Sequence, residues 1–390
     1  MNTDQLQTIL RLSRSRAAWA TDLRRRLHRR PEPAFREYST AKCIAEALSA
    51  QGLTVRTGVA ETGLLVDINS QQSGGYVVLR ADMDALAITE ATGAEYTSEN
   101  LGYSHSCGHD GHCAALAAAG AVLMELRDAW RGRIRLLFQP AEETAEGARS
   151  MIAAGALDPR PDAILSLHGW PGLKTGAVAC RNSTMLASCD VVEIHIKGRG
   201  GHGARPHLAN NPLVGAARVV DRLSGLDGAE RVVSMCMARV GEQANVIADS
   251  GQLAGTVRAL TPAVRDRTLR EIRTTVAQAC GELGMTADVA FHGHSPAVVT
   301  DRRLHAVFRR AGLGLLGEDN VLELDAPSMG SEDFGWYLEH VPGLLFRVGM
   351  GLDGAGLHEA GFDFNDQALP PAAAMLCAMA IQICNEGLGE

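Results

Sequence analysis

The first part of the chain alternates between short apolar runs and amphipathic stretches. The runs at 76–84 (YVVLRADMD), 133–143 (RIRLLFQPAEE) and 163–170 (AILSLHGW) have the length and apolar character of buried strands. Between them, 110–128 and 145–155 are predicted to be helices, because Ala and Leu fill the first and a glycine ends the second. Strands that alternate with helices predict a mostly parallel sheet with helices on both faces.

The pattern changes over residues 188–297. There the chain is predicted to run strand, helix, strand, strand, helix, strand, with a long amphipathic helix over 262–283. This order is the split βαβ arrangement of a ferredoxin-like sandwich. The segment 298–390 returns to helix–strand alternation and is expected to complete the first sheet. We therefore predict an α/β protein in which 1–187 and 298–390 form one domain and 188–297 forms an inserted α+β domain.

Polar residues stand where three of the predicted strands end. Asp82 and Asp84 close the first run. Glu142 and Glu143 follow the second run, and His168 lies near the end of the third. In open parallel sheets, ligands bind outside the carboxyl ends of the strands. These side chains are therefore expected to converge on one crevice.

The stretch HSCGHDGHC (105–113) places three histidines and two cysteines at the start of a predicted helix. Cys107 and His109 lie two positions apart on a compact turn and are able to face one ion. Thiolate, imidazole and carboxylate are ordinary ligands of a borderline divalent metal. A small buried apolar role is the alternative for such a cysteine, and a zinc finger is disfavoured because no second Cys or His pair follows at suitable spacing. Together with the strand-end carboxylates and His168, the stretch indicates a hydrolytic metal site.

Composition narrows the class of protein. The 390 residues are 46% hydrophobic, and the net charge of −8 argues against a nucleic-acid partner. No apolar run reaches the roughly 18 residues that a membrane span needs, so no membrane partner is expected. The nine cysteines are scattered from Cys43 to Cys384 without framework spacing, which favours reduced thiols over disulfides. A globular, cytoplasmic protein is expected.

Ten short motifs, taken in order, are similar to those of one enzyme family. They are LHRRPEPAFREYSTA, RADMDAL, HSCGHDGH, FQPAEE, LHGWP, GGHGARPH, NVIAD, GTVRAL, MGSEDF and LHEAGFDFND. Over nearly its whole length the chain resembles the metal-dependent amidohydrolases that include hippurate hydrolases, N-acyl-amino-acid hydrolases and plant auxin-conjugate hydrolases. These belong with aminoacylase and the carboxypeptidase-type dinuclear metallopeptidases. One such motif is only suggestive, whereas ten in the same order are specific.

The resemblance implies two divalent metal ions per subunit, with manganese or zinc expected and cobalt or nickel also compatible with the ligands. The implied ligands are Cys107, His109, Glu143, His168 and His358. Cys107 stands where relatives carry a bridging aspartate, so a bridging thiolate is implied. The resemblance further implies that 1–187 and 298–390 form a catalytic domain and that 188–297 is a lid and dimerisation domain.

The resemblance also assigns roles in catalysis. Glu142 matches the general base, and Asp84 matches the carboxylate that orients a ligand or the base. On the inserted domain, His202, Asn245 and Arg258 match groups that contact the substrate. His202 is expected to donate a hydrogen bond to the developing oxyanion, and Arg258 to bind the substrate's free carboxylate. Without the resemblance, His202 is one residue of a glycine-rich turn and Arg258 is an ordinary surface charge.

The implied reaction is hydrolysis of the amide bond of a small N-acyl or N-aroyl amino acid, such as a hippurate-like or N-acetyl amino acid, by metal-activated water. Two other functions remain open. A dipeptidase or carboxypeptidase acting on short peptides would be favoured by a preference for a free α-amine. A non-catalytic binder of amino-acid conjugates would keep the fold without turnover, and Glu142 together with the full ligand set argues against it.

The resemblance implies a homodimer or higher homo-oligomer formed through 188–297, in which His202 acts in the active site of the partner. The chain departs from the family pattern at Ala87, where relatives usually carry proline, and around His358, whose neighbours differ. Histidines near the motifs that match no ligand are expected to pack or to support the site; they are His28, His105 and His112.

Overall fold

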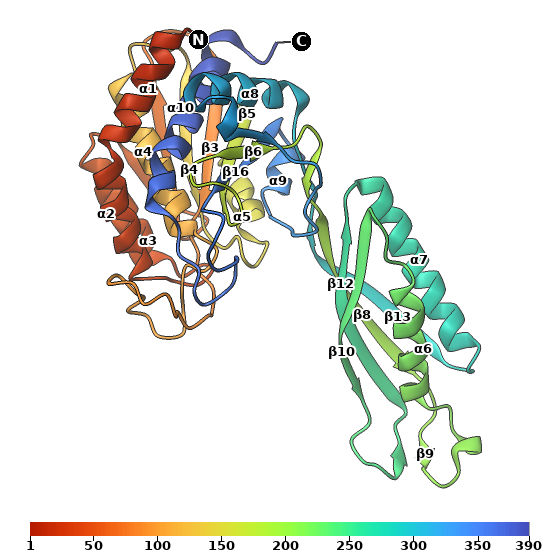
Figure 1. Ribbon diagram of the computed structural model, residues 1–390. Coiled ribbons are helices and arrows are strands. Elements are labelled where there is room, and N and C mark those ends of the chain that lie inside the picture. Colours follow the sequence, from red (N-terminus) through yellow and green to blue (C-terminus); the bar gives the residue numbers. More distant parts are fainter. Residues whose placement is uncertain (390) are drawn as a thin grey trace. The chain divides into compact units, whose positions relative to one another are not determined.

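The computed structural model describes residues 1–389, which form two compact units. The first unit contains Met1–Met185, Val299–Ala326 and Trp336–Glu390, and the second contains Leu186–Val298 and Pro327–Gly335. Each unit has its own principal sheet and its own buried core (Figure 1).

The first unit is built on an eight-stranded sheet of order β1-β2-β4-β3-β5-β16-β6-β15. Its strands are β1 (Val55–Val59), β2 (Gly63–Asn69), β3 (Tyr76–Asp82), β4 (Arg133–Gln139), β5 (Ala163–Trp170), β6 (Val178–Cys180), β15 (Val321–Glu323) and β16 (Gly343–Gly349). The neighbours β4, β3, β5 and β16 run parallel, and β1, β2 and β6 join antiparallel to their neighbours β2, β4 and β16. Every residue of β16 is buried, as expected for a parallel strand covered on both faces.

Helices cover this sheet. They are α1 (Thr3–Ser15), α2 (Ala17–His28), α3 (Tyr38–Ser49), α4 (His109–Glu125), α5 (Gly147–Ala153), α8 (Arg302–Leu316), the short α9 (Gly335–Leu338) and α10 (Leu369–Glu386). α4 and α10 pack against each other and against β3 and β5 (Figure 1). The segment Asp366–Glu386 is long and apolar enough to cross a membrane, but 83% of its apolar window is buried inside the protein. α10 is therefore placed as the central helix of a packed core.

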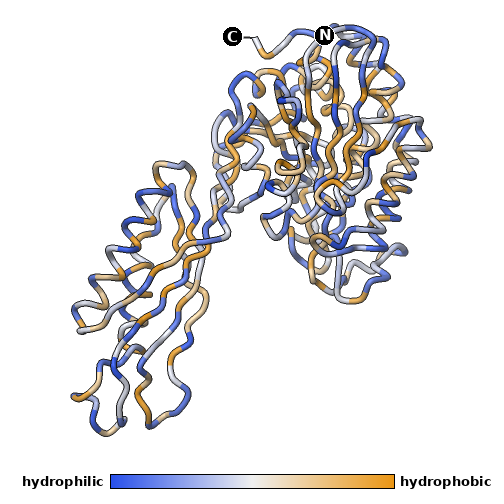
Figure 2. The backbone as a smooth tube through the Cα atoms, turned by 180° about the vertical axis from the view of Figure 1, so that it is seen from behind, coloured by the Kyte–Doolittle hydropathy of each residue, from blue (hydrophilic) through white to orange (hydrophobic). Residues whose placement is uncertain are grey.

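The second unit is a four-stranded antiparallel sheet of order β10-β12-β8-β13 with two helices. Its elements are β8 (Ser188–Lys197), β9 (Gly201–His202), α6 (Pro212–Ser224), β10 (Arg231–Val240), β11 (Val246–Ile247), β12 (Ser250–Ala259), α7 (Pro262–Gly281) and β13 (Thr286–Ser295). Buried and partly exposed residues alternate along β8, and hydrophilic and hydrophobic positions intermix along these strands (Figure 2). One face of the sheet therefore packs on α6 and α7.

The core of this unit joins the sheet to both helices. Ile194 of β8, Leu223 of α6 and Ile272 of α7 are fully buried in it. The longer elements follow the predicted order β-α-β-β-α-β, with the small β9 and β11 as additions. Together with the mostly parallel sheet of the first unit, this confirms the predicted fold class.

A short segment far along the chain also belongs to the second unit. The amide of Ala187 donates to the carbonyl oxygens of Ser328 (3.1 Å) and Gly330 (3.0 Å). Arg258 Nη1 donates to the carbonyl oxygen of Met329 at 2.8 Å. These hydrogen bonds attach Pro327–Gly335 to the second unit, although the sequence places it within the 298–390 segment.

Candidate metal centre

The ends of three neighbouring parallel strands bring the strand-end residues together. β3 ends at Asp82, β4 runs into the turn that carries Glu142 and Glu143, and β5 carries His168. α4 begins at His109, directly after Gly108. Gly108 has φ 85°, a conformation that glycine adopts without the cost of a side chain. The chain can therefore turn between Cys107 and His109 so that both face the strand ends.

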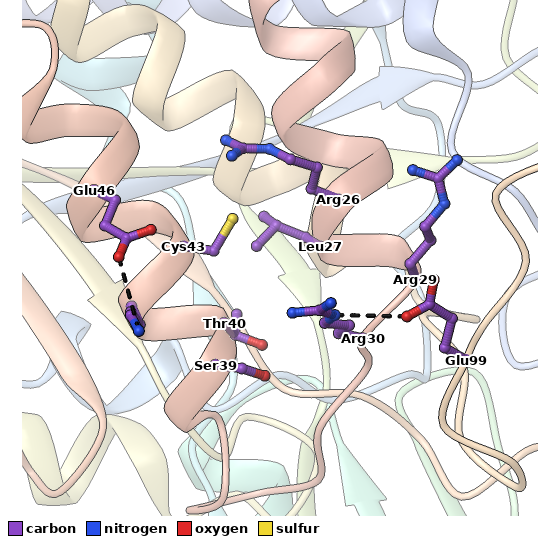
Figure 3. Close-up of a pocket in the computed structure, with 10 residues that line it drawn as sticks. Arg26, Leu27, Arg29, Arg30, Ser39, Thr40, Cys43, Glu46 and Glu99 are labelled. Carbon is purple, nitrogen blue, oxygen red and sulfur yellow. Dashed lines mark ion pairs between the residues drawn. The ribbon is translucent and has the colours of Figure 1, made fainter.

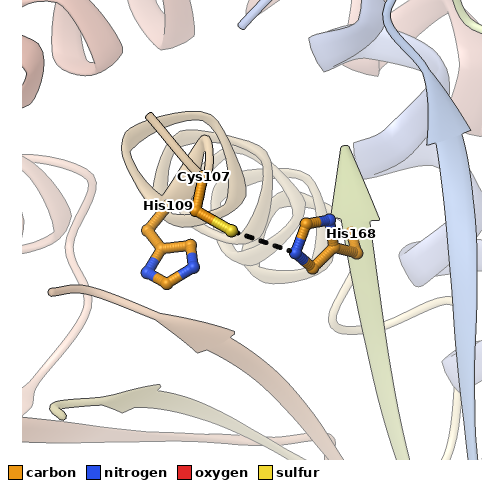
Figure 4. A group of neighbouring side chains, drawn as sticks. All are labelled: Cys107, His109 and His168. Atoms are coloured by element: carbon orange, nitrogen blue, oxygen red, sulfur yellow. Dashed lines mark hydrogen bonds between the residues drawn. The ribbon is translucent and has the colours of Figure 1, made fainter. Parts of the chain in front are cut away.

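All five predicted ligands lie in one cluster. Three groups have ligand atoms within 4.8 Å of one another: Cys107, His109 and His168; Cys107, Glu143 and His358; and His109, Glu142 and Glu143. Cys107 Sγ is 3.5 Å from His168 Nε2 (Figure 4). Glu143 Oε1 is 3.8 Å from His109 Nε2 and 3.6 Å from His358 Nε2. Cys107, His109 and Glu143 each belong to two of these groups. The cluster therefore resembles two adjacent metal sites that have residues in common.

The chemistry of the cluster fits divalent cations. His109 Nε2 and Glu143 Oε1 are buried and have no hydrogen-bond partner, which is unusual for buried polar atoms. Burial raises the pKa of the Cys107 thiol well above its usual value and that of Glu143 to about 7. A cation among these atoms would reverse both shifts and satisfy the orphaned atoms. The thiol, imidazole and carboxylate donors suit a borderline metal.

Asp84 fixes the turn that carries the two glutamates. Its Oδ1 accepts the amide N–H of Glu142 and its Oδ2 that of Glu143, both at 3.0 Å. The preceding residue, Ala141, has φ 55°, an uncommon value for a residue with a side chain. Glu37 Oε1 accepts the Ala141 amide at 2.9 Å. Two carboxylates thus hold a strained turn, so that adjacent glutamates are presented side by side.

His112 is engaged by hydrogen bonds at both of its ring nitrogens. Its Nδ1 is 2.6 Å from Asp82 Oδ1, and its Nε2 accepts the amide N–H of Gly169 at 2.8 Å. Both ring nitrogens are therefore in use, and the Gly169 contact requires that the proton sits on Nδ1. Asp82 in turn accepts from Arg80 Nη1 at 2.8 Å. His112 and Asp82 support the strand next to His168.

The loop of His358 is tied to the helices. His358 has φ 64°, and its amide donates to the carbonyl oxygen of Ser106 at 2.8 Å. Further along the loop, Asp363 Oδ1 accepts from Arg24 Nη1 at 2.7 Å, and the same nitrogen is 3.2 Å from Asp110 Oδ2. Arg24 and Asp110 are fully buried, so their ion pair is shielded from water, whereas the Asp363 side chain is partly exposed. The two ion pairs anchor the loop beside the start of α4.

His28 extends this network. Its Nδ1 is 2.8 Å from Asp110 Oδ2, and its Nε2 is 3.2 Å from Glu90 Oε1. Burial lowers the pKa of His28, but the hydrogen bond and charge of Asp110 outweigh it and raise the pKa to about 9. Burial lowers the pKa of His105 to about 4, so this ring is neutral. His28 is therefore held as a cation in the support of the site.

The three predicted substrate residues lie in the second unit, in two separate places. His202 on β9 pairs with Val246, and the amide of Gly203 donates to the carbonyl oxygen of Asn245 at 2.9 Å. His202 Nδ1 accepts the amide of Ala204 at 3.1 Å, which leaves Nε2 as the N–H donor of the neutral ring. His202 and Asn245 thus lie side by side.

Arg258 lies at the other end of the sheet. β12 begins at Ser250, which pairs with Lys197 of β8. Next to this pair, the amide of Gly198 donates to the carbonyl oxygen of Asp249. The start of β12 therefore lies close to β9 and β11. Eight positions of extended strand separate Ser250 from Arg258, a distance of about 26 Å. Within one chain the second unit therefore does not bring Arg258 together with His202 and Asn245.

The first unit also contains a pocket that is lined by none of the five predicted metal ligands. This pocket of about 510 Å³ lies between α2 and α3 and is lined by Arg26, Leu27, Arg29, Arg30, Ser39, Thr40, Lys42, Cys43, Glu46 and Glu99 (Figure 3). Arg30 Nε is 3.6 Å from Glu99, and Lys42 Nζ is 3.9 Å from Glu46. Its charges neutralise one another in part, and its one thiol has a pKa raised by burial. We assign no chemistry to it.

Two residues that support the centre have roles that no local pattern in the sequence predicts. Glu37 and Arg24 act on Ala141 and Asp363, which lie 104 and 339 positions away along the chain. Glu37 lies in the motif LHRRPEPAFREYSTA and Arg24 just before it, but a charged residue is ordinarily exposed, so its position alone does not indicate such a contact.

Comparison with known proteins supports the same class of site. The model of the family described as peptidase family M20/M25/M40 matches residues 78–382. The chain is 33% identical to an N-acetyl-L-cysteine deacetylase of Bacillus subtilis over 91% of this chain and 85% of the relative. It is 34% identical to an IAA-amino acid hydrolase (ILR1-like 2) of Arabidopsis thaliana, over 99% of this chain and 90% of the relative.

Solved structures agree along the whole chain. The crystal structure of a Bacillus subtilis protein described as a dinuclear metal binding peptidase of the M20 family is 28% identical, covers 95% of this chain and 99% of its own, and has a TM-score of 0.86. A putative aminohydrolase from Staphylococcus aureus is 30% identical, with a TM-score of 0.89 and coverage of 97% and 100%. With the clustered ligands and the matched motifs, these likenesses show that the chain belongs to peptidase family M20/M25/M40, as a metal-dependent hydrolase of amide bonds.

Proposed function

We propose that this protein hydrolyses the amide bond of N-acyl or N-aroyl amino acids, releasing a carboxylic acid and a free amino acid. The observation that carries the proposal is the set of three adjoining ligand groups, each two of which have Cys107, His109 or Glu143 in common. Relatives named for N-acetyl-L-cysteine and for IAA-amino acid conjugates support this substrate class.

The proposed ligands of two divalent ions are Cys107, His109, Glu143, His168 and His358. When bound, such ions polarise an amide carbonyl and make water more acidic. Manganese or zinc is the proposed metal, with cobalt and nickel also suited to the donors. The nine cysteines are all free thiols, which supports a reducing, cytoplasmic location.

Glu142 is the proposed general base. It takes the proton of the attacking water and passes it to the leaving amine, a role worth about 10²–10⁴-fold in rate. Asp84 accepts hydrogen bonds from the backbone amides of Glu142 and Glu143, and so fixes the turn from which both glutamate side chains project. His202 Nε2–H is the proposed donor to the oxyanion, and Arg258 and Asn245 are the proposed contacts for the substrate carboxylate.

A second candidate is a carboxypeptidase or dipeptidase. A thermostable carboxypeptidase of Saccharolobus solfataricus is 31% identical to the chain and covers 94% of it. Both reactions use the same centre, and they differ in whether the substrate carries a free α-amine. A non-catalytic binder is the third candidate, and the presence of Glu142 beside the ligands speaks against it.

We also propose that 1–187 and 298–390 act as a catalytic domain and that 188–297 acts as a lid and dimerisation domain. Arg258 and the pair His202–Asn245 lie at opposite ends of β12, too far apart for one small substrate to contact both within a single second unit. This separation supports a homodimer or higher homo-oligomer in which His202 and Asn245 of one subunit serve the active site of its partner.

The function is tested by hydrolysis assays of the manganese- or zinc-loaded protein. We expect turnover of N-acetyl, N-benzoyl or indole-acetyl amino acids, measured as released amino acid, and loss of turnover after chelation with recovery on adding metal. Dipeptides with a free α-amine are the comparison set. Faster cleavage of the dipeptides would replace the acylase assignment with the peptidase one, and no turnover of either set would favour the binder.

Replacement of Cys107 tests the thiolate ligand. Cys107→Ala should hold less metal per subunit than the wild type, measured by elemental analysis, and lose activity while circular dichroism is unchanged. Cys377→Ala is the control, because this thiol is also fully buried but donates to the carbonyl oxygen of Ala119 in the core. Unchanged metal stoichiometry in Cys107→Ala would remove Cys107 from the ligand set.

Replacement of the two adjacent glutamates is expected to impair the enzyme in different ways. Glu142→Gln should keep its metal and lose about 10²–10⁴-fold in kcat, because an amide cannot accept the proton. Glu143→Gln should weaken metal affinity, so that activity partly returns at high metal concentration. Metal titrations read by activity and by calorimetry separate the two. The reverse pattern would exchange the roles.

Subunit mixing tests the partner contribution. His202→Ala and Glu142→Gln should each be inactive alone, whereas a hybrid dimer should recover up to about half of the wild-type activity, because one of its two sites is intact. Subunit exchange is verified with differently tagged chains. If verified hybrids recover nothing, His202 serves its own subunit.

A further inference from the structure

Arg347 is a buried arginine that lacks an acidic partner among the described residues. It lies on β16 and is 7% exposed. Its Nη2 is buried without a hydrogen-bond partner, and no residue from 1 to 389 forms an ion pair with it. Burial lowers its pKa to about 10, with only the Cys180 thiol opposing this, so the side chain is a cation at neutral pH.

The position of Arg347 is next to the proposed metal centre. Its Cα pairs with that of His168 in the parallel register of β16 and β5. Paired residues of neighbouring strands point to the same face of a sheet, so Arg347, His168 and, two residues on, Trp170 share one face. The Trp170 ring lies 5.7 Å from the His168 ring and 3.5 Å from Arg347 Cζ. Arg347 therefore lies at the carboxyl ends of the strands, where parallel sheets bind ligands.

Packing alone does not account for this side chain. An uncompensated buried charge is destabilising, and an apolar residue would fill the place in GLLFRVG without that cost. The Trp170 ring offsets part of the cost through a cation–π contact with one face of the guanidinium. Such stacking leaves the edge N–H groups of the planar guanidinium available. That edge matches a carboxylate in a paired, two-bond geometry.

We propose that Arg347 is a specificity residue that binds a second carboxylate of the substrate. The inference rests on the proposed function, in which the lone carboxylate of a simple N-acyl amino acid is already assigned to Arg258 and Asn245. It narrows the substrate class to dicarboxylates. The extra carboxylate has two chemical sources: the far end of a dicarboxylic acyl group, or the side chain of an acidic amino acid.

Three matched substrates separate these sources. N-acetyl-methionine has one carboxylate, N-succinyl-methionine has a second on the acyl side, and N-acetyl-glutamate has a second on the amino-acid side. Wild-type enzyme should favour one of the dicarboxylates in kcat/KM. Arg347→Met should lower kcat/KM for that substrate by about ten- to a hundredfold, the value of a charge-assisted hydrogen-bond pair, and leave N-acetyl-methionine unchanged.

Two further variants keep the test sharp. Arg347→Lys retains the charge without the fork and should lose less than Arg347→Met; it also serves if the methionine variant does not fold. Arg149→Met is the control, because Arg149 also stacks on a tryptophan, Trp336 at 5.2 Å, but is exposed on α5. This control should not change the preference between the substrates.

Binding measurements distinguish a failure of this inference from a failure of the proposed function. Calorimetry with N-succinyl-methionine and N-acetyl-glutamate on metal-loaded wild type and Arg347→Met reads the carboxylate contact without turnover. Weaker binding of a dicarboxylate to the variant supports the inference even if no substrate is cleaved, in which case only the proposed function fails. Equal loss on all three substrates, or no loss on any, in an enzyme that cleaves N-acetyl-methionine overturns the assignment of Arg347.

Discussion

The two hydrogen bonds from the amides of Glu142 and Glu143 to the Asp84 carboxylate are the constraint on which the rest of the centre depends. Adjacent side chains on a regular strand point to opposite faces, so the proposed base Glu142 and the proposed ligand Glu143 need an irregular turn to face the same site. Asp84 supplies that turn from the end of the neighbouring strand, and Glu37 holds it from the other side. A buried carboxylate that accepts two amide N–H groups is satisfied and rigid.

Further hydrogen bonds and ion pairs hold the segments around this turn. His112 is saturated by Asp82 and Gly169, so it orders the β5 backbone beside His168 instead of competing for metal. Arg24 joins Asp110, at the start of α4, to Asp363 in the loop of His358. His109 Nε2 and Glu143 Oε1, which are buried without hydrogen-bond partners, thus lie beside groups that hold the surrounding backbone in place. Buried polar atoms without partners are uncommon, and a bound cation would satisfy these two.

The sequence predicted those features of the fold and the site that depend on neighbouring residues, such as an apolar run that ends in polar side chains. Apolar runs that stop at Asp82, Glu142 and His168 predicted both the strands and the edge at which these residues meet. The order of elements over 188–297 predicted the second sheet, because alternation and helical periodicity are local properties. Specific side-chain hydrogen bonds between distant segments could not be predicted. Examples are the hydrogen bonds that Glu37, Arg24 and the segment 327–335 form with residues far away in the sequence. Likewise, the role of a single charged residue in an apolar run, such as Arg347, cannot be inferred until its neighbours in space are known.

The spread of the clustered residues along the chain has a consequence for biosynthesis. Cys107, His109, Glu143 and His168 are synthesised early, whereas His358 emerges only after the whole second unit has been translated. A nascent chain therefore presents an incomplete cluster while the second unit is still leaving the ribosome. In proteins whose ligands are gathered by folding, metal affinity develops together with the native structure. The proposed metal site would accordingly be complete only after the C-terminal loop with His358 has been synthesised.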